Sequence, residues 1–367
     1  MPLPSLDKLP ALDSLDLHGQ RVLVRVDLNA APGDMPTLSV LVDVALPTVR
    51  QLLGAGARVI LASHCQGAAD EELPSLETAG ALLAERLNCD LYLPEDVTGD
   101  AARKVTSDLR SGQLALLENL ARDPGELSGD EVFARKLSNL CDVYVNDAPS
   151  LLDRKLASLI HLPRLAPERT IGLSMSTALA GLHQLEAFRG KLCCVFSSTT
   201  LNASLLRELQ GWLSRVDALI VVDAASSAFV AAAPKNAPAA AAWPAEVLAH
   251  CRSLITTAQT RDKKLLWPPP GLAAEALSTW LKDRLPAGPL LLVGPWPHSE
   301  LSTATLNALL AQRVWAGAAG IEAVTALQVC DPAVLGTVAL RGLNSEVVLR
   351  ALTGDPLPAL TALSAAV

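Results

Sequence analysis

Aromatic side chains and runs of like charge are scarce in this chain of 367 residues. Phe, Trp and Tyr together make up 3% of the chain, so its buried cores must be built mainly from Leu, Val and Ala. Charged residues make up 19%, the net charge is −8, and no Lys/Arg-rich run occurs. The composition therefore argues against nucleic acid as the main partner, and an anionic ligand would need a local basic cluster.

The sequence also lacks the patterns of a secretion signal, a membrane span and a metal site. Residues 1–17 have neither a basic start nor an apolar core. No uninterrupted apolar run reaches about eighteen residues. The seven cysteines contain no Cys-x-x-Cys pair, and the six histidines are scattered. We therefore expect a cytoplasmic protein with reduced, buried thiols, no metal ligand cluster and no membrane contact.

What the sequence does contain is an alternation of strand and helix patterns along the whole chain. Strands are predicted at 21–29, 58–62, 90–93, 113–117, 142–145, 191–196, 218–223, 264–267, 290–293 and 312–315. Helices are predicted at 44–54, 75–87, 101–110, 128–140, 174–188, 201–213, 244–258, 273–285, 302–310 and 320–328. The stretch 224–242 is rich in Ala and Pro and predicts a loop.

This alternation is typical of parallel sheets with crossover helices, and it restarts after Pro163, Pro167 and Gly172. The sequence therefore predicts an α/β fold of two doubly wound parallel-sheet domains joined by a hinge helix. The expected ranges are 1–164 for the N-terminal domain, 165–189 for the hinge helix, 190–347 for the C-terminal domain and 348–367 for a C-terminal tail.

The first strand, R-V-L-V-R-V-D-L-N at 21–29, ends in two polar residues, Asp27 and Asn29, whose spacing points both side chains the same way. In parallel sheets, ligands bind beyond the carboxyl ends of the strands. The position allows two interpretations, a ligand contact or a cap of the loop that follows.

Motifs at several predicted strand ends occur together and in a fixed order. They are R-V-D-L-N at 25–29, A-L-P-T at 45–48, S-H at 63–64, L-L-E-N-L at 116–120, V-N-D-A at 145–148, Arg154, A-S at 157–158 and G-P at 294–295. In these motifs the chain resembles the phosphoglycerate kinase family, strongly over 20–160 and weakly beyond about 200. The resemblance implies a hinge enzyme whose N-terminal domain holds 3-phosphoglycerate, whose C-terminal domain holds Mg-ATP, and whose tail returns to the N-terminal domain.

Carried over by resemblance, four residual substrate-binding residues remain: Asp27, Asn29, His64 and Arg154. The absence of their partners favours hydrogen bonding to the loop after Pro32 for Asp27 and Asn29. It favours a strand-end cap for His64 and a plain ion pair with Asp153 or Asp147 for Arg154.

The arginines that the family places around the acid substrate are missing. Leu41, Gly67 and Ala121 occupy their positions, and Arg122 is one residue out of register. Each hydrogen bond to a charged group contributes roughly 1.5–3 kcal/mol. Losing three such contacts therefore removes roughly 5–9 kcal/mol of binding free energy. The whole binding free energy at micromolar affinity is about 8 kcal/mol.

The nucleotide side departs further from the family. The stretch 197–204 has no Gly and no Lys, and Thr200 and Ser204 stand in the lysine positions. Its polar run at 197–200 is expected to cap the helix that follows. Residual nucleotide-binding residues, implied weakly by the resemblance, are Gly294, Gly317 and Glu300, and Glu300 is also read as a plain surface carboxylate.

The family's magnesium-binding loop appears as 316–320, with Ala319 at the position of the metal-binding Asp.

Three hypotheses about function follow from the sequence. The first is a pseudoenzyme, a monomer that binds an unidentified protein partner in a regulatory or scaffolding role. The second is a working phosphoglycerate kinase, with Arg122 and Arg154 as substitutes and Mg-ATP or Mg-ADP as cofactor. The third is a changed ligand at the N-terminal site.

Overall fold

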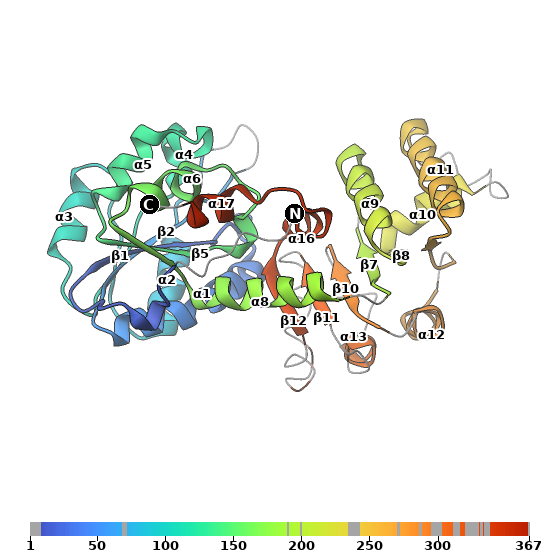
Figure 1. The fold of residues 1–367 in the computed structure, drawn as a ribbon, viewed down its shortest axis with the longest axis horizontal. Helices are drawn as coiled ribbons and strands as arrows, with labels where there is room; N and C mark the ends of the chain where they lie inside the picture. The colour runs from blue at the N-terminus through green and yellow to red at the C-terminus, as the bar shows by residue number, and fades with distance from the viewer. Residues whose placement is uncertain are drawn as a thin grey trace. The chain divides into compact units, whose positions relative to one another are not determined.

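The computed structural model describes residues 9–67, 72–188, 191–198, 200–233, 243–269, 272–285, 288–294, 303–310, 316–319, 330, 333 and 338–365. By their contacts the residues form two compact units. The first unit comprises Met1–Leu179 and Gly354–Val367, and the second comprises Ala180–Thr353. Each unit is an α/β structure built on its own sheet (Figure 1).

The first unit contains a six-stranded parallel sheet in the order β3-β4-β2-β1-β5-β6. The strands are β1 (Arg21–Val26), β2 (Arg58–Ala62), β3 (Leu91–Tyr92), β4 (Leu114–Leu116), β5 (Val143–Asp147) and β6 (Glu168–Ile171). In the register, Val24 of the central β1 lies opposite Leu61 on one side and Val145 on the other. The residues after β1 therefore emerge at the middle of the sheet edge.

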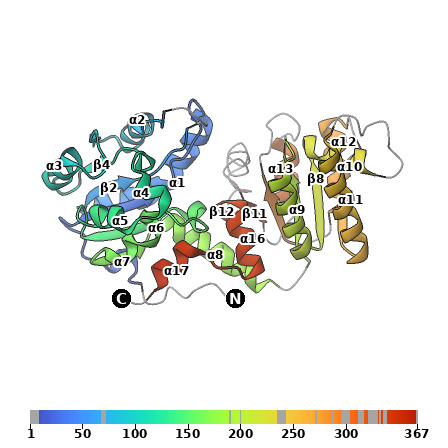
Figure 2. The same ribbon diagram turned by 90° about the horizontal axis from the view of Figure 1, so that it is seen from above.

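Helices cover both faces of this sheet (Figures 1 and 2). They are η1 (Leu12–Ser14), α1 (Met35–Gly54), α2 (Glu77–Leu87), α3 (Asp100–Asp108), η2 (Leu120–Arg122), α4 (Pro124–Ser128), α5 (Glu131–Ser138), η3 (Pro149–Leu151), α6 (Ala157–Ile160), α7 (Leu162–Leu165) and α17 (Pro358–Ser364). The core on one face joins Leu23 and Tyr144 of the sheet to Phe133 of α5, Leu162 of α7 and Leu363 of α17. The C-terminal helix is therefore part of the first unit's core.

Helix α1 begins at Met35, nine residues before the predicted start at Val44. The Asp34 side chain accepts a hydrogen bond from the Thr37 backbone N–H and fixes this earlier start. By length and composition alone α1 would suffice to cross a membrane. Its buried residues, which include Val42, Val49 and Leu52, pack in the first unit as those of a core helix do.

The second unit repeats the parallel arrangement in the order β12-β11-β10-β7-β8-β9. The strands are β7 (Cys193–Ser197), β8 (Ala218–Val222), β9 (Lys264–Leu266), β10 (Leu290–Val293), β11 (Ala316–Ala319) and β12 (Val338–Leu343). The helices are α9 (Ala203–Arg215), α10 (Asp223–Ala232), α11 (Ala245–Thr260), α12 (Ala274–Arg284), α13 (Thr303–Leu310) and α16 (Ser345–Thr353). Helix α8 (Leu173–Ala187) begins in the first unit and passes into the second after Leu179.

Several sequence predictions are wrong in this structure. The predicted loop at 224–242 begins with helix α10, because the Ala-rich run 224–232 carries a buried face with Phe229 at its centre. The predicted loop at 316–320 begins with strand β11, whose small residues are buried between β10 and β12. Strand β6 lies among the prolines that the sequence marks as a boundary. The predicted strand 312–315 and helix 320–328 lie outside the described residues.

Candidate functional site

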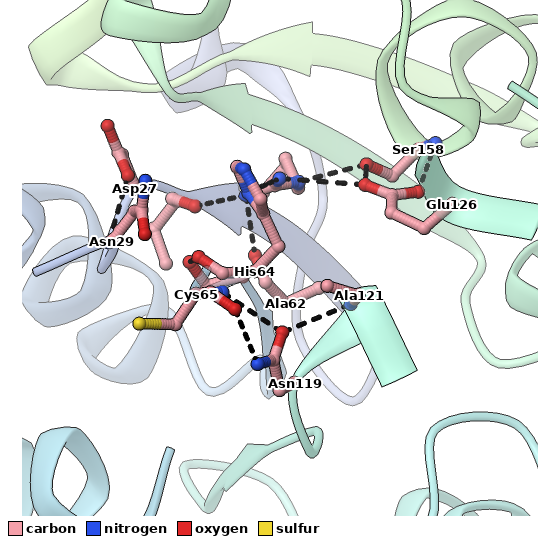
Figure 3. Close-up of polar contacts among 12 residues, drawn as sticks. Asp27, Asn29, Ala62, His64, Cys65, Asn119, Ala121, Glu126 and Ser158 are labelled. Atoms are coloured by element: carbon pink, nitrogen blue, oxygen red, sulfur yellow. Dashed lines mark hydrogen bonds and ion pairs between the residues drawn. The ribbon is translucent and has the colours of Figure 1, made fainter. Parts of the chain in front are cut away.

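Asp27 and Asn29 lie beyond the end of β1, where the sequence predicts them, and both are engaged within the first unit (Figure 3). The Asp27 carboxylate accepts hydrogen bonds from the Asn29 backbone N–H at 3.0 Å and from the Ser150 hydroxyl. Asn29 Oδ1 accepts from the backbone N–H of Gln66 at 2.9 Å. The contact between Asp27 and the Asn29 backbone is local, whereas Gln66 belongs to the loop after β2. None of these hydrogen bonds goes to the loop after Pro32 that the sequence favoured.

His64 follows β2 and is 4% exposed. Its Nδ1 lies 2.7 Å from Nη2 of Arg25, a fully buried side chain of β1. Burial, Arg25 and Arg154 together lower the pKa of His64 to about 3. The imidazole is therefore neutral at physiological pH and supplies no cation for an anionic ligand. The expected strand-end cap is replaced by a side-chain contact with the neighbouring strand.

Arg25 belongs to a buried network with Ser158 and Glu126. Its Nε donates to Ser158 Oγ at 2.9 Å, and its Nη2 lies 3.6 Å from Glu126 Oε1. Glu126 also accepts hydrogen bonds from the hydroxyl of Ser158 at 2.6 Å and from its backbone N–H at 2.9 Å. Both charged side chains are fully buried, so each depends on the other for compensation.

Arg154 is the fourth predicted substrate-binding residue, and its side chain is 59% exposed. Its Nε lies 3.7 Å from a carboxylate oxygen of Asp153, the first of the two expected ion-pair partners. Asp147, the other expected partner, is the last residue of β5 and is buried against the start of α8 instead. It accepts hydrogen bonds there from the backbone N–H of Met175 at 3.0 Å and the hydroxyl of Ser174 at 3.1 Å.

The positions that lack the family's arginines offer no replacement cation. Leu41 and Ala121 are buried in the apolar core. Arg122, one residue out of register, donates to the backbone carbonyl of Leu73 at 3.2 Å. Asn119, beside it, bonds to the backbone N–H and carbonyl of Cys65 and holds the loop after β2 in place.

In the second unit, Ser198 and Asn202 after β7 form hydrogen bonds with neighbouring backbone groups. Asn202 Oδ1 accepts from the backbone N–H groups of Ser204 and Leu205, both at 3.0 Å, and caps α9. Ser198 Oγ donates to the carbonyl of Thr200 at 2.6 Å. The prediction that the run 197–200 caps this helix is wrong, because α9 begins later, at Ala203, where Asn202 precedes it.

Two of the predicted nucleotide-binding residues are described glycines, and both lie close to neighbouring strands of the second unit's sheet. Gly294 has a φ of 88°, and a Cβ there would lie 2.2 Å from the carbonyl oxygen of Ser197. Gly317 pairs with Leu291 and Leu340 inside the buried strand β11. Glu300 lies outside the described residues. The nucleotide-binding roles of these residues stay predictions.

The described residues do not fit a magnesium nucleotide. They contain no group of three His, Cys, Asp or Glu side chains that could hold a metal ion. Ala319, at the position of the metal-binding Asp, carries no ligand atom and is buried. Thr200 and Ser204 are exposed, uncharged side chains in the positions of phosphate-neutralising lysines.

Comparison with known proteins gives one consistent result. Residues 12–286 match the family model described as phosphoglycerate kinase. The phosphoglycerate kinase of Anaeromyxobacter sp. (strain K) is 33% identical over 267 residues, which cover 71% of this chain and 67% of that protein. The phosphoglycerate kinase of Desulfosudis oleivorans is 30% identical over 342 residues, which cover 90% and 86%.

The chain belongs to the phosphoglycerate kinase family.

The fold agrees with this family. The crystal structure of phosphoglycerate kinase from Pyrococcus horikoshii OT3 superposes with a TM-score of 0.75 and covers 96% of this chain and 98% of that one, at 20% identity. The structure from Coxiella burnetii gives a TM-score of 0.67 at the same identity. The predicted phosphoglycerate kinase fold, with two parallel-sheet α/β domains, is therefore confirmed.

Sequence reasoning missed the residues that hold the site in place. Arg25 occurs in the R-V-D-L-N motif with no predicted role, although a charged residue on the same strand face as the core residue Leu23 signals a buried partner. Glu126, in the turn Pro-Gly-Glu, gave no signal of its own. Asn202 could have been found as a favoured helix-capping residue one position before an Ala-Ser-Leu-Leu run.

Proposed function

We propose that this member of the phosphoglycerate kinase family has lost phosphoryl transfer and acts as a cytoplasmic binding, regulatory or scaffold protein. The observation that carries the proposal is the stretch after β7. Phosphoryl transfer depends on positioning and on neutralising the charge of the phosphates. Here Asn202 uses the amide groups at the start of α9, and Thr200 and Ser204 offer no charge.

The substrate side supports the same conclusion. His64 is neutral, the Leu41, Gly67 and Ala121 positions carry no cation, and Arg154 faces Asp153. Removing one preorganised donor to a transition state costs about 10²–10³ in rate. Several such groups are absent together, so little turnover is expected even if neighbouring residues recover one contact.

The alternative is a working phosphoglycerate kinase that transfers phosphate between ATP and 3-phosphoglycerate. It is supported by the matches to proteins of that name along most of the chain. Arg122 and Arg154 would then have to replace the missing arginines by moving from their present partners.

A coupled assay with 3-phosphoglycerate and Mg-ATP separates the two. The Anaeromyxobacter phosphoglycerate kinase, run in parallel, is the positive control. We expect no turnover for this chain above background. A rate above about 1 s⁻¹, the low end for ordinary enzymes, would overturn the proposal.

Isothermal calorimetry with Mg-ATP adds an independent test. We expect no heat of binding up to millimolar nucleotide, because the second unit offers no described cation at the end of β7 or the start of α9. Binding without turnover would move the proposal from a protein scaffold to a nucleotide-responsive regulator.

A further inference from the structure

The contact between Arg25 and His64 fixes where the imidazole hydrogen lies. A guanidinium group donates hydrogen bonds and accepts none. Arg25 Nη2 lies 2.7 Å from Nδ1 of His64, so this nitrogen must accept and carries no hydrogen. The ring's one hydrogen is therefore on Nε2, and a second proton could enter only against the guanidinium.

Arg25 cannot turn away from this contact at low cost. Its Nε donates to Ser158 of α6, and its Nη1 donates to the backbone carbonyls of Val26 and Ala62. Its Nη2 also lies 3.6 Å from Glu126 of α4, inside a fully buried environment. Moving the guanidinium would leave the Glu126 carboxylate buried without its counter-charge. The orientation of His64 is thus set by a network that extends away from the sheet edge into the core.

Two positive charges oppose protonation of His64. Arg25 faces the ring from β1, and Arg154 faces it from the segment after η3. The buried carboxylate of Glu126 in α4 is already paired with Arg25. The neighbouring thiol of Cys65 has its pKa raised by burial and is uncharged at neutral pH. Burial first, and then Arg25 and Arg154, lower the pKa of His64 to about 3, which agrees with the hydrogen-bond geometry.

We propose that Arg25 is a positioning residue for ligand selection, because it holds His64 as a neutral donor through Nε2. Among the described residues no hydrogen bond to Nε2 occurs, so this N–H can donate to an oxygen atom of a ligand. A neutral donor adds no charge to the contact, so it removes the advantage that a protonated His64 would give phosphate or carboxylate over an uncharged hydroxyl or carbonyl oxygen. This deepens the proposed function, on which it rests for its biological meaning.

Nitrogen-detected NMR on the full ¹⁵N-labelled chain tests the proposal directly. The His64 signals are assigned by their loss in His64→Asn. In the wild type we expect the Nε2–H tautomer, with no titration between pH 5 and pH 8. A pKa between 5.5 and 7.5, or a hydrogen on Nδ1, would overturn the proposal whatever the activity assay shows.

Variants then test whether Arg25 is the cause. In Arg25→Gln the positive charge and the guanidinium fork are both removed. We expect the pKa of His64 to rise from about 3 toward its ordinary value of 6.5 without reaching it, because burial is the largest cause of the shift and remains. Arg58→Gln is the matched control and should leave His64 unchanged, because the Arg58 guanidinium bonds the carbonyl of Gly19 at the other end of the sheet. A folded Arg25→Gln protein with an unchanged His64 pKa would remove Arg25 from this role.

Ser158→Ala serves if Arg25→Gln does not fold. It removes the partner of Arg25 Nε, and we expect a smaller rise of the His64 pKa in the same direction. No rise in this folded variant would contradict the proposed network. Turnover in the coupled assay with a neutral His64 would overturn the proposed function alone, whereas an inactive protein with a titrating His64 would overturn this inference alone.

Discussion

The carboxyl ends of the strands differ in kind between the two units. In the first unit, Arg25 and Glu126 form a fully buried charged pair directly behind His64. In the second unit, the corresponding edge is closed by short polar side chains, with Ser198 bonded to Thr200 and Asn202 bonded to the helix that follows. One edge is held by buried charge and the other by local capping.

Because of this difference, a single substitution is expected to cost more stability at the first edge than at the second. Removing one member of a buried ion pair leaves the other charged and desolvated, so single changes there are resisted. A capped surface stretch accepts most small polar residues with little loss of stability. The first unit therefore keeps recognisable family motifs at its strand ends, and the second can lose its glycines and lysines while the fold persists.

The largest expected effect comes from breaking the buried pair. Arg25→Met leaves Glu126 buried without compensation and should lower the free energy of unfolding by about 3–5 kcal/mol, measured by urea denaturation. Arg135→Met, which removes an exposed pair with Glu131, should cost less than about 1 kcal/mol. Similar losses in the two variants would mean that the buried pair is not what distinguishes the first edge. The double variant Arg25→Met/Glu126→Gln should recover part of the loss.

The next effect tests backbone geometry at the second edge. Gly294→Ala places a Cβ 2.2 Å from a backbone carbonyl oxygen at a positive φ, so it should destabilise by about 2–4 kcal/mol. Gly33→Ala has a similar φ of 81° with open space around it, and about 1 kcal/mol is expected. Thermal and urea unfolding of both variants give the comparison. Equal losses would show that Ser197 and Gly294 do not approach as closely as described.

A smaller effect is expected at the helix cap. Asn202→Ala should cost about 1 kcal/mol, because two amide groups of α9 lose their acceptor. Asp130→Ala, which removes the cap of α5 in the first unit, is the matched control with a similar loss. A thermal-shift titration with Mg-ATP should show no stabilisation of Asn202→Ala. Stabilisation there would indicate that freed amide groups alone restore nucleotide binding.

The smallest expected effect is a dependence of stability on pH that arises from Asp147, next to the start of α8. Burial raises the pKa of Asp147 above its ordinary value of 3.8, so the folded state binds its proton more tightly than the unfolded state. This contribution to stability is present below pH 3.8 and is lost as the pH rises through the raised pKa. Asp147→Asn removes the dependence, so its stability relative to wild type should increase from pH 3.5 to pH 7.

Urea denaturation at both pH values measures this change. Asp130→Asn, an exposed cap of α5, controls for the loss of one surface charge. A stability difference between Asp147→Asn and wild type that does not vary with pH would contradict the buried, shifted carboxyl.

The alternation of strands and helices could be predicted because most strands here are buried apolar runs between clear turn signals. Strand β10, Leu290–Val293, has the bounds expected from its four apolar residues. Helix α10 could not be found, because an Ala-rich run has no polar face to give it periodicity. Strand β11 could not be found for a related reason: Ala and Gly have weak strand preferences, and only burial between β10 and β12 makes Ala316–Ala319 extended.

The candidate site was predictable only where residues follow strands directly. Asp27 and Asn29 lie at the edge that their spacing indicated. The partner of His64 was not predictable, because Arg25, Glu126 and Ser158 are separated by up to 133 residues and meet only after the sheet has formed. Sequence spacing gives the order of strand ends, whereas side-chain partners depend on which strands become neighbours.

The cap made by Asn202 also limits what a mutation at the start of α9 can achieve. The amide groups that would have to face a bound anion there already contribute about 1 kcal/mol of stability through one side chain. Any mutation that frees them is destabilising before it is useful. A new binding site at this helix start would therefore first have to offset a loss of folding free energy.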